Sequence, residues 1–121
     1  MLAVTRYRVP DADAQQFLDR ARTALAALAA RPGHVHGVVG RSTDDPGLWT
    51  LTTFWDSVGA YRRALSAYEV KLYAHPLMYL AVDEPTAFEP LVESDGSGAL
   101  AERGSDRAPD ADTIGLDDEK A

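Results

Sequence analysis

The chain contains no cysteine, so it can form no disulfide framework, thiol nucleophile or cysteine metal site. It also lacks a long hydrophobic run, and its longest apolar stretch falls far short of the roughly 20 residues that a membrane-spanning helix needs. Its first residues, MLAVTRYRVP, lack the uninterrupted apolar core of a secretory signal and have the composition of a strand. We therefore expect a soluble, cytoplasmic protein without membrane association.

Acidic residues are concentrated near the C-terminal end. Residues 93–121 hold nine acidic and three basic residues, a net charge of −6, whereas residues 1–92 hold ten acidic and nine basic residues, a net charge of −1. Nucleic-acid binding needs a basic face, which this nearly neutral body does not supply. Glycine, serine and aspartate dominate from Glu93 onward. We therefore expect one domain over residues 1–92 and an acidic, disordered tail over residues 93–121.

Several chemical motifs are missing as well. The sequence has no glycine-rich phosphate loop, no nucleophile elbow and no paired-carboxylate motif, and we expect no cofactor. His34 and His36 have a spacing that two metal ligands can share, but no acidic or histidine partner lies near them in the sequence. We expect no metal site there, and assign both histidines to the surface or to a dimer interface.

Four segments have the composition of β-strands. Residues 2–9, 34–41 and 48–55 are rich in β-branched and aromatic types. Residues 82–92 form a weaker candidate, because their two prolines suit an edge strand better than a central one.

Two segments predict helices. Residues 10–30 carry apolar side chains at helical spacing, with Asp11 or Asp13 as N-cap, a capping box suggested between Asp13 and Gln16, and Pro32-Gly33 ending the helix. The second helix begins after Ser57 and is broken or kinked at His75-Pro76. Its expected apolar stripe consists of Val58, Tyr61, Leu65, Tyr68 and Leu72.

The element order β-α-β-β-α-β indicates an α+β, ferredoxin-like fold with a four-stranded antiparallel sheet. Both faces of the strand at 48–55 are apolar, with Leu48 and Phe54 on one face and Trp49, Leu51 and Trp55 on the other. Two helices cover only one face of such a sheet. The second face therefore predicts a homodimer that packs sheet against sheet.

The run RPGHVHGVVGRSTDDPGLWTLTTFWDSVGAYRR resembles the antibiotic-biosynthesis-monooxygenase domain of the dimeric α/β-barrel superfamily. The matching features are PG before the second strand, DDPG in the hairpin, and a strand ending in W-[DE]-S before a helix with A-Y. The resemblance covers residues 2–92 and implies a ferredoxin-like fold that dimerises into an α/β barrel.

The resemblance also implies an activity. One branch of the superfamily oxidises anthrone-type or other polyketide aromatics to quinones with molecular oxygen, using neither metal nor flavin. The phenolate substrate supplies the electron to oxygen, while the protein removes a proton, holds the flat ring system and excludes water. Trp55 and Tyr61 match a tryptophan and a tyrosine implicated in that branch, whereas Leu51 replaces its asparagine. The implied partners are a small aromatic molecule and molecular oxygen.

These residues define the candidate site. Trp55 and Tyr61 would position and hydrogen-bond the substrate, and His75 would take the proton, since histidine is the natural base near neutral pH. Leu51 and Tyr7 complete the expected substrate-binding set, in a cavity between the sheet and its helices. The purely structural interpretation makes Trp55 and Tyr61 packing residues and leaves His75 exposed at a helix end.

Two alternative functions remain open. A non-catalytic ligand-binding or accessory module is favoured by Leu51, and a side-chain-filled interior would support it, whereas a deep apolar cavity reaching Tyr61 would support the enzyme. Haem binding through His75 is a third hypothesis. The haem-degrading branch has an asparagine and a tryptophan where this chain has Thr5 and Ala64, which makes haem degradation a poor match.

Overall fold

The computed structural model describes residues 1–105, and the chain divides into two compact units, Met1–Phe88 and a second unit that begins at Glu89. The first unit contains, in order, β1 (Leu2–Arg8), the 3-10 helix η1 (Asp11–Asp13), α1 (Ala14–Ala29), β2 (His34–Arg41), β3 (Leu48–Trp55), α2 (Val58–Leu65), α3 (Tyr68–Tyr73), α4 (His75–Met78) and β4 (Ala87–Phe88). No helix within residues 1–105 has both the length and the apolar composition to cross a membrane.

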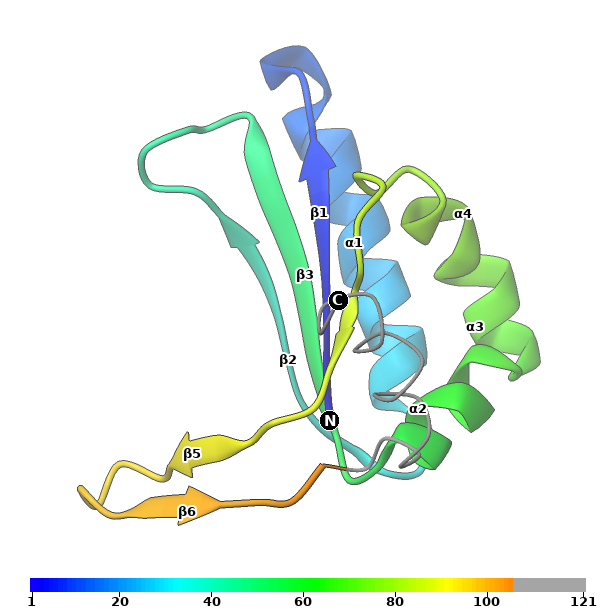
Figure 1. Ribbon diagram of the computed structural model, residues 1–121. Coiled ribbons are helices and arrows are strands. Elements are labelled where there is room, and N and C mark those ends of the chain that lie inside the picture. Colours follow the sequence, from blue (N-terminus) through cyan, green and yellow to red (C-terminus); the bar gives the residue numbers. More distant parts are fainter. Residues whose placement is uncertain (106–121) are drawn as a thin grey trace, which may run out of the picture. The chain divides into compact units, whose positions relative to one another are not determined.

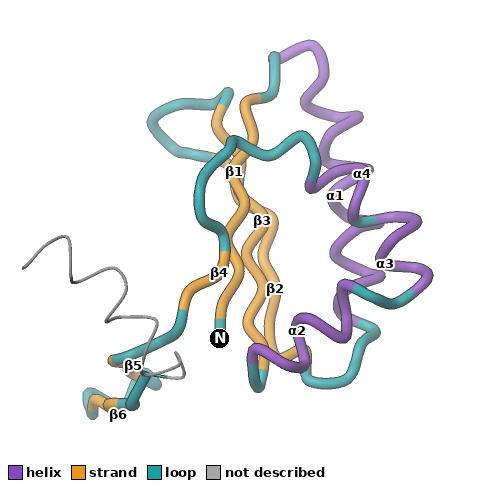
Figure 2. Tube along the Cα trace, turned by 45° about the vertical axis from the view of Figure 1, so that its right-hand side comes forward, coloured by secondary structure: helices purple, strands orange, loops and turns teal. Residues whose placement is uncertain are grey.

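The four strands of the first unit form an antiparallel sheet in the order β2-β3-β1-β4. Helices α1 to α4 all lie on one face of this sheet (Figures 1 and 2). This arrangement confirms the predicted ferredoxin-like α+β fold. The sheet is open in the described residues and does not close into a barrel.

The register between β1 and β3 determines which side chains point toward the helices. Thr5 is paired with Leu51, and Tyr7 with Trp49. Because side chains alternate along a strand, these four lie on the helical face, where all are buried. Phe17 of α1 packs between the two aromatic residues, with ring centroids 5.0 Å from Tyr7 and 5.3 Å from Trp49.

Helix α1 is confirmed, but the predicted capping box is wrong. The side chain of Asp13 makes no cap hydrogen bond. Its backbone N–H donates to the carbonyl of Pro10 at 2.9 Å, because residues 11–13 form a 3-10 turn that leads into the helix. Ser57, by contrast, caps α2 as expected, since its hydroxyl accepts from the N–H of Ala60 at 3.0 Å.

The second predicted helix is interrupted, and its expected stripe is wrong beyond Leu65. Ala67 has an extended conformation (φ −70°, ψ 143°) that separates α2 from α3. This break changes the phase of the helix, so Val70 is buried while Tyr68 and Leu72 are exposed. The predicted break at His75-Pro76 corresponds to the junction between α3 and α4.

The predicted edge strand at 82–92 is reduced to the two residues of β4. The segment before β4 still follows β1, because the N–H of Val82 donates to the carbonyl of Arg6 and the N–H of Val4 donates to the carbonyl of Thr86, both at 2.7 Å. The prolines at 85 and 90 cannot donate to a ladder, which limits its length.

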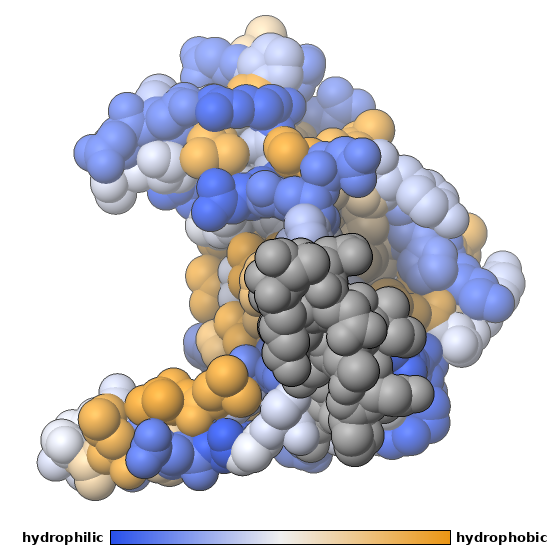
Figure 3. All heavy atoms as spheres, in the orientation of Figure 1, coloured by the Kyte–Doolittle hydropathy of each residue, from blue (hydrophilic) through white to orange (hydrophobic). Residues whose placement is uncertain are grey.

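The second unit contains a hairpin where the composition predicts a disordered tail. Its strands are β5 (Val92–Ser94) and β6 (Leu100–Glu102), and Gly96 and Gly98 adopt positive φ in the connecting turn. Figure 3 shows apolar atoms exposed on this hairpin. Residues 106–121 of the predicted tail lie outside the described residues, so the domain division at residue 92 stays a prediction.

Gly33 connects α1 to β2 at a point where no larger residue fits. Its φ is +88°, and an added Cβ would lie 2.5 Å from the Cβ of Ala60. We expect Gly33→Ala to lower the free energy of unfolding by about 2–4 kcal/mol, because backbone strain adds to steric overlap. Urea denaturation measures this difference. Gly47→Ala is the matched control, because its added Cβ meets nothing closer than 3.5 Å; equal losses in both variants would contradict the account.

Candidate functional site

A cavity on the helical side of β1 is lined by His75, and we call it the His75 cavity. Its volume is about 480 Å³, within the range of roughly 300–1,000 Å³ that is typical of small-molecule sites. It lies among β1, the end of α2, α4 and the segment that follows α4. Its polar lining consists of Thr5, His75, Tyr79, Asp83, Glu84 and Thr86.

The imidazole of His75 is held in one tautomer. Its Nε2 lies 2.9 Å from the carbonyl oxygen of Leu65, at the end of α2. Because a carbonyl oxygen only accepts hydrogen bonds, Nε2 carries the hydrogen and donates it. The neutral ring therefore has its free lone pair on Nδ1, the atom that can take a proton. Haem binding through Nε2 would require this hydrogen bond to break.

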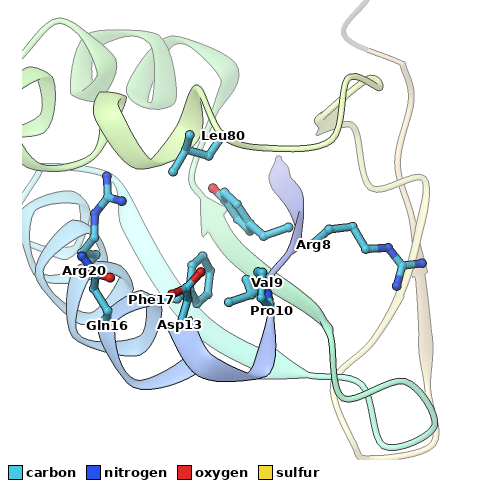
Figure 4. Close-up of a pocket in the computed structure, with 9 residues that line it drawn as sticks. Arg8, Val9, Pro10, Asp13, Gln16, Phe17, Arg20 and Leu80 are labelled. Carbon is cyan, nitrogen blue, oxygen red and sulfur yellow. The ribbon is translucent and has the colours of Figure 1, made fainter.

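A smaller cavity is lined by Tyr7, and we call it the Tyr7 cavity. Its volume is about 200 Å³, and it lies between the end of β1, the start of α1 and Leu80 (Figure 4). Phe17 and Leu80 supply apolar lining, and Arg20 extends from α1 beside it. The cavity is small for a polycyclic ligand, so the His75 cavity is the better candidate site.

A hydrogen-bonded pair from β1 separates the two cavities. Thr5 lines the His75 cavity and Tyr7 lines the Tyr7 cavity, while the hydroxyl oxygens of these two residues are 2.9 Å apart. Thr5 donates its only hydroxyl hydrogen to the carbonyl of Leu51 at 3.3 Å. The Tyr7 hydroxyl must therefore be the donor in its bond to Thr5.

Trp55 and Tyr61 pack against each other at the strand–helix junction, with ring centroids 5.6 Å apart. The indole N–H of Trp55 donates to the hydroxyl of Thr53 at 2.8 Å, so its only donor is already occupied. The hydroxyl of Tyr61 has no hydrogen-bond partner within residues 1–105. Burial, with a smaller contribution from the nearby Tyr7, raises the pKa of Tyr61, which keeps its hydroxyl protonated at neutral pH.

The predicted site residues fall into two groups. Trp55, Tyr61 and Leu51 are buried in the packed interior and line neither cavity, so their contact with a substrate stays a prediction. Tyr7 and His75 each line one cavity. The cavity-lining role of Thr5 was not predicted from the sequence, although strand alternation places Thr5 on the same face as Tyr7 and was the available signal.

His34 and His36 each contact an aromatic ring of β3. The ring of His34 meets Trp55 edge to face at 5.0 Å, and His36 lies beside Phe54 at 5.8 Å. Burial, together with the nearby His36, lowers the pKa of His34. Within the part of the chain that the structure describes, no group of three or more histidine, aspartate or glutamate side chains is arranged to hold a metal ion.

Residues 1–75 match the protein family described as antibiotic biosynthesis monooxygenase. Among solved structures, the chain is similar to SnoaB, a cofactor-independent oxygenase from Streptomyces nogalater, with 27% identity and a TM-score of 0.57 over 67% of this chain and 82% of that one. A mutant of SnoaB aligns with 32% identity and a TM-score of 0.56 over the same shares of the two chains.

A conserved protein from Methanosarcina mazei Go1 shares the fold, with 17% identity and a TM-score of 0.59 over 71% of this chain and 84% of that one. No curated protein sequence matches the chain.

Alkaline pH should destabilise the fold through its buried tyrosines. Burial raises the pKa of Tyr7, partly offset by its hydrogen bond with Thr5, and the pKa of Tyr61 is raised as well. A raised pKa means that the folded state holds the proton more tightly than the unfolded state. The resulting stability is present below pH about 10 and is lost as the pH rises through the folded pKa values.

Urea denaturation across this pH range measures the effect. We expect Tyr7→Phe to lower the free energy of unfolding by about 1 kcal/mol near neutral pH, because the hydrogen bond with Thr5 is lost. At alkaline pH the free energy of unfolding of this variant should decline less steeply than that of the wild type. Tyr68→Phe is the control, because Tyr68 is an exposed tyrosine on α3. An alkaline decline that is identical in wild type and Tyr7→Phe would contradict this assignment.

Proposed function

The chain belongs to the antibiotic biosynthesis monooxygenase family, and we propose that it oxidises a flat, anthrone-type aromatic substrate with molecular oxygen, without a cofactor, in the His75 cavity. The observation that carries this proposal is the His75 imidazole, which donates from Nε2 to the Leu65 carbonyl, so that the neutral ring has its lone pair on Nδ1, and which lines a cavity of about 480 Å³. The similarity to SnoaB, a cofactor-independent oxygenase, supports the reaction class.

The proposed reaction replaces the two hydrogens of an anthrone methylene group by one oxygen atom. Nδ1 of His75 takes a proton from the substrate, which gives an electron-rich anion. This anion transfers one electron to molecular oxygen, and the resulting radical pair combines to form a carbon–oxygen bond. Loss of water from the hydroperoxide, with a proton returned by the imidazolium, yields the quinone. One oxygen atom enters the product and the other leaves as water.

Other residues would hold the substrate in this proposal. Tyr61 has a protonated hydroxyl without a partner in residues 1–105, which suits it to donate to a substrate oxygen. Thr5 lines the His75 cavity and is hydrogen-bonded to Tyr7, which also influences the pKa of Tyr61. Trp55 and Leu51 would supply apolar surroundings that exclude water. Because Tyr61 and Trp55 do not line the His75 cavity, contact with them requires the substrate to extend beyond its lining residues.

A non-catalytic ligand-binding module is the second candidate function. The observation that favours it is the packed interior around Trp55, whose only donor is bonded to Thr53. Such a module would bind a flat aromatic molecule in the His75 cavity and leave it unchanged.

Oxygen consumption with an anthrone, without added metal or flavin, distinguishes these functions. We expect His75→Gln to lower the rate about 10²- to 10⁴-fold, which is typical of the loss of a general base. The glutamine amide can still donate to the Leu65 carbonyl, so this variant removes the base and retains that contact. His34→Gln is the matched control and should consume oxygen at the wild-type rate.

Three other results have definite meanings. Equal rates in His75→Gln and wild type would remove His75 from the mechanism. Anthrone binding without oxygen uptake would favour the binding module. A Soret band that appears on adding haem and is absent in His75→Ala would instead support haem binding.

We further propose that the protein is a homodimer that forms through the sheet face opposite the helices. Leu2, Val4 and Phe54 lie on this outer face in the register of β1 and β3 and are only partly buried, and Phe88 of β4 is exposed. A hollow of about 360 Å³ beside Val4 and Phe88 leaves further apolar surface open. A second copy of the same face would cover these side chains.

A charge at the centre of this face should separate the subunits. We expect Val4→Lys to raise the dimer dissociation constant about 100-fold, because a buried lysine lacks a partner and repels its symmetry mate. Sedimentation equilibrium measures the change. Leu72→Lys, on an exposed position of α3, is the control. A dimer that persists in Val4→Lys and dissociates in the control would place the interface on the helices.

A further inference from the structure

The charged lining of the His75 cavity is entirely acidic. Asp83 and Glu84 line it, and no arginine or lysine is among its lining residues. Glu84 is paired with Arg6, whose Nε lies 3.3 Å from its carboxylate, on a side chain that is more than half exposed. Asp83 has no ion pair or hydrogen bond within the described residues. The cavity therefore presents an uncompensated negative charge to whatever it binds.

Tyr79 places an aromatic ring at the same cavity. The residue follows α4, is 81% exposed and lines the cavity. Its ring centroid is 6.1 Å from that of His75, with an interplanar angle of 79°. The ring contacts the proposed base through an edge-to-face arrangement while most of its surface remains available. Such a surface can stack against a flat aromatic molecule.

From these observations we propose that the His75 cavity takes a neutral, hydroxylated, flat aromatic molecule, stacked on Tyr79, and discriminates against a carboxylated analogue of the same molecule. The inference rests on the proposed function and specifies the substrate class of the same site. Phenolic hydroxyls can donate hydrogen bonds to the carboxylate of Asp83. A carboxylate on the ligand would meet the like charge of Asp83, an exposed residue, so water and salt weaken this repulsion without removing it.

Unlike the His75 cavity, the Tyr7 cavity has basic residues in its lining. Arg8 and Arg20 both line it, together with Asp13. Arg8 is paired with Asp45, whereas Arg20 has no ion pair within residues 1–105. A carboxylated aromatic molecule would therefore find its favourable charge beside Arg20, outside the His75 cavity.

Binding of two redox-inert ligands tests the proposal without requiring catalysis. The probes are a dihydroxyanthraquinone and its ring-carboxylated analogue, titrated into the full chain by calorimetry at one fixed ionic strength. We expect the neutral quinone to bind about tenfold more tightly than the carboxylated one, a difference of about 1.4 kcal/mol. Asp83→Asn should reduce this preference to about threefold or less, with little effect on the neutral ligand.

Tyr79 is tested with a matched pair of variants. Tyr79→Ala should weaken both ligands about tenfold through the lost stacking surface, and Tyr79→Phe should restore the affinity. Tyr68→Ala removes another tyrosine that is 76% exposed but does not line the cavity, and it should leave both affinities unchanged.

The outcomes separate this inference from the proposed function. Equal or tighter binding of the carboxylated quinone, a preference that survives Asp83→Asn, or no binding of either quinone overturns the inference. Tighter binding of the neutral quinone that depends on Asp83 and Tyr79, in a protein that consumes no oxygen, upholds the inference and removes the proposed oxygenation. Oxygen consumption that is equally fast with neutral and carboxylated anthrones upholds the oxygenation and overturns the inference.

Discussion

The antiparallel register between β1 and β3 is the constraint on which the rest of the structure depends. It pairs Thr5 with Leu51 and Tyr7 with Trp49, and so places all four side chains under the helices. A slip of one residue would exchange the two faces of β1, turning Arg6 and Arg8 into the core and Thr5 and Tyr7 out of it. The Thr5–Tyr7 hydrogen bond, both cavities and the apolar outer face all follow from this register.

Much of the fold could be predicted from the sequence, because its strands have a strong local signal. The ranges expected for β2 and β3 agree with the structure, and that for β1 differs by one residue at its end. The break at Ala67 carried no such signal, since serine and alanine are both tolerated inside helices. The tertiary contacts that bury Val70 decide the phase of α3 and exclude Tyr68 from the core. The short hairpin of β5 and β6 was also missed, because its composition is that of a linker.

The candidate site could be predicted only in part, for a related reason. Trp55 and Tyr61 were correctly expected at the strand–helix junction, where their rings are 5.6 Å apart. Sequence spacing could not show that this junction is packed, or that the larger cavity is lined by neither residue. That cavity combines residues from β1, α4 and the segment after α4, which are far apart in the chain. Among the residues that line this cavity, only His75 was predicted from the sequence as a site residue, on the acid–base chemistry of its side chain.

The central claim of this account is that the His75 cavity is the place where the substrate binds. A crystal structure of the protein with a bound dihydroxyanthraquinone tests it most directly. The account predicts a flat ligand between Thr5 and Tyr79, with an oxygen atom within hydrogen-bonding distance of the imidazole of His75 or the hydroxyl of Thr5. A ligand seated beside Phe17 and Arg20 in the Tyr7 cavity, or on the outer face of the sheet, would contradict it.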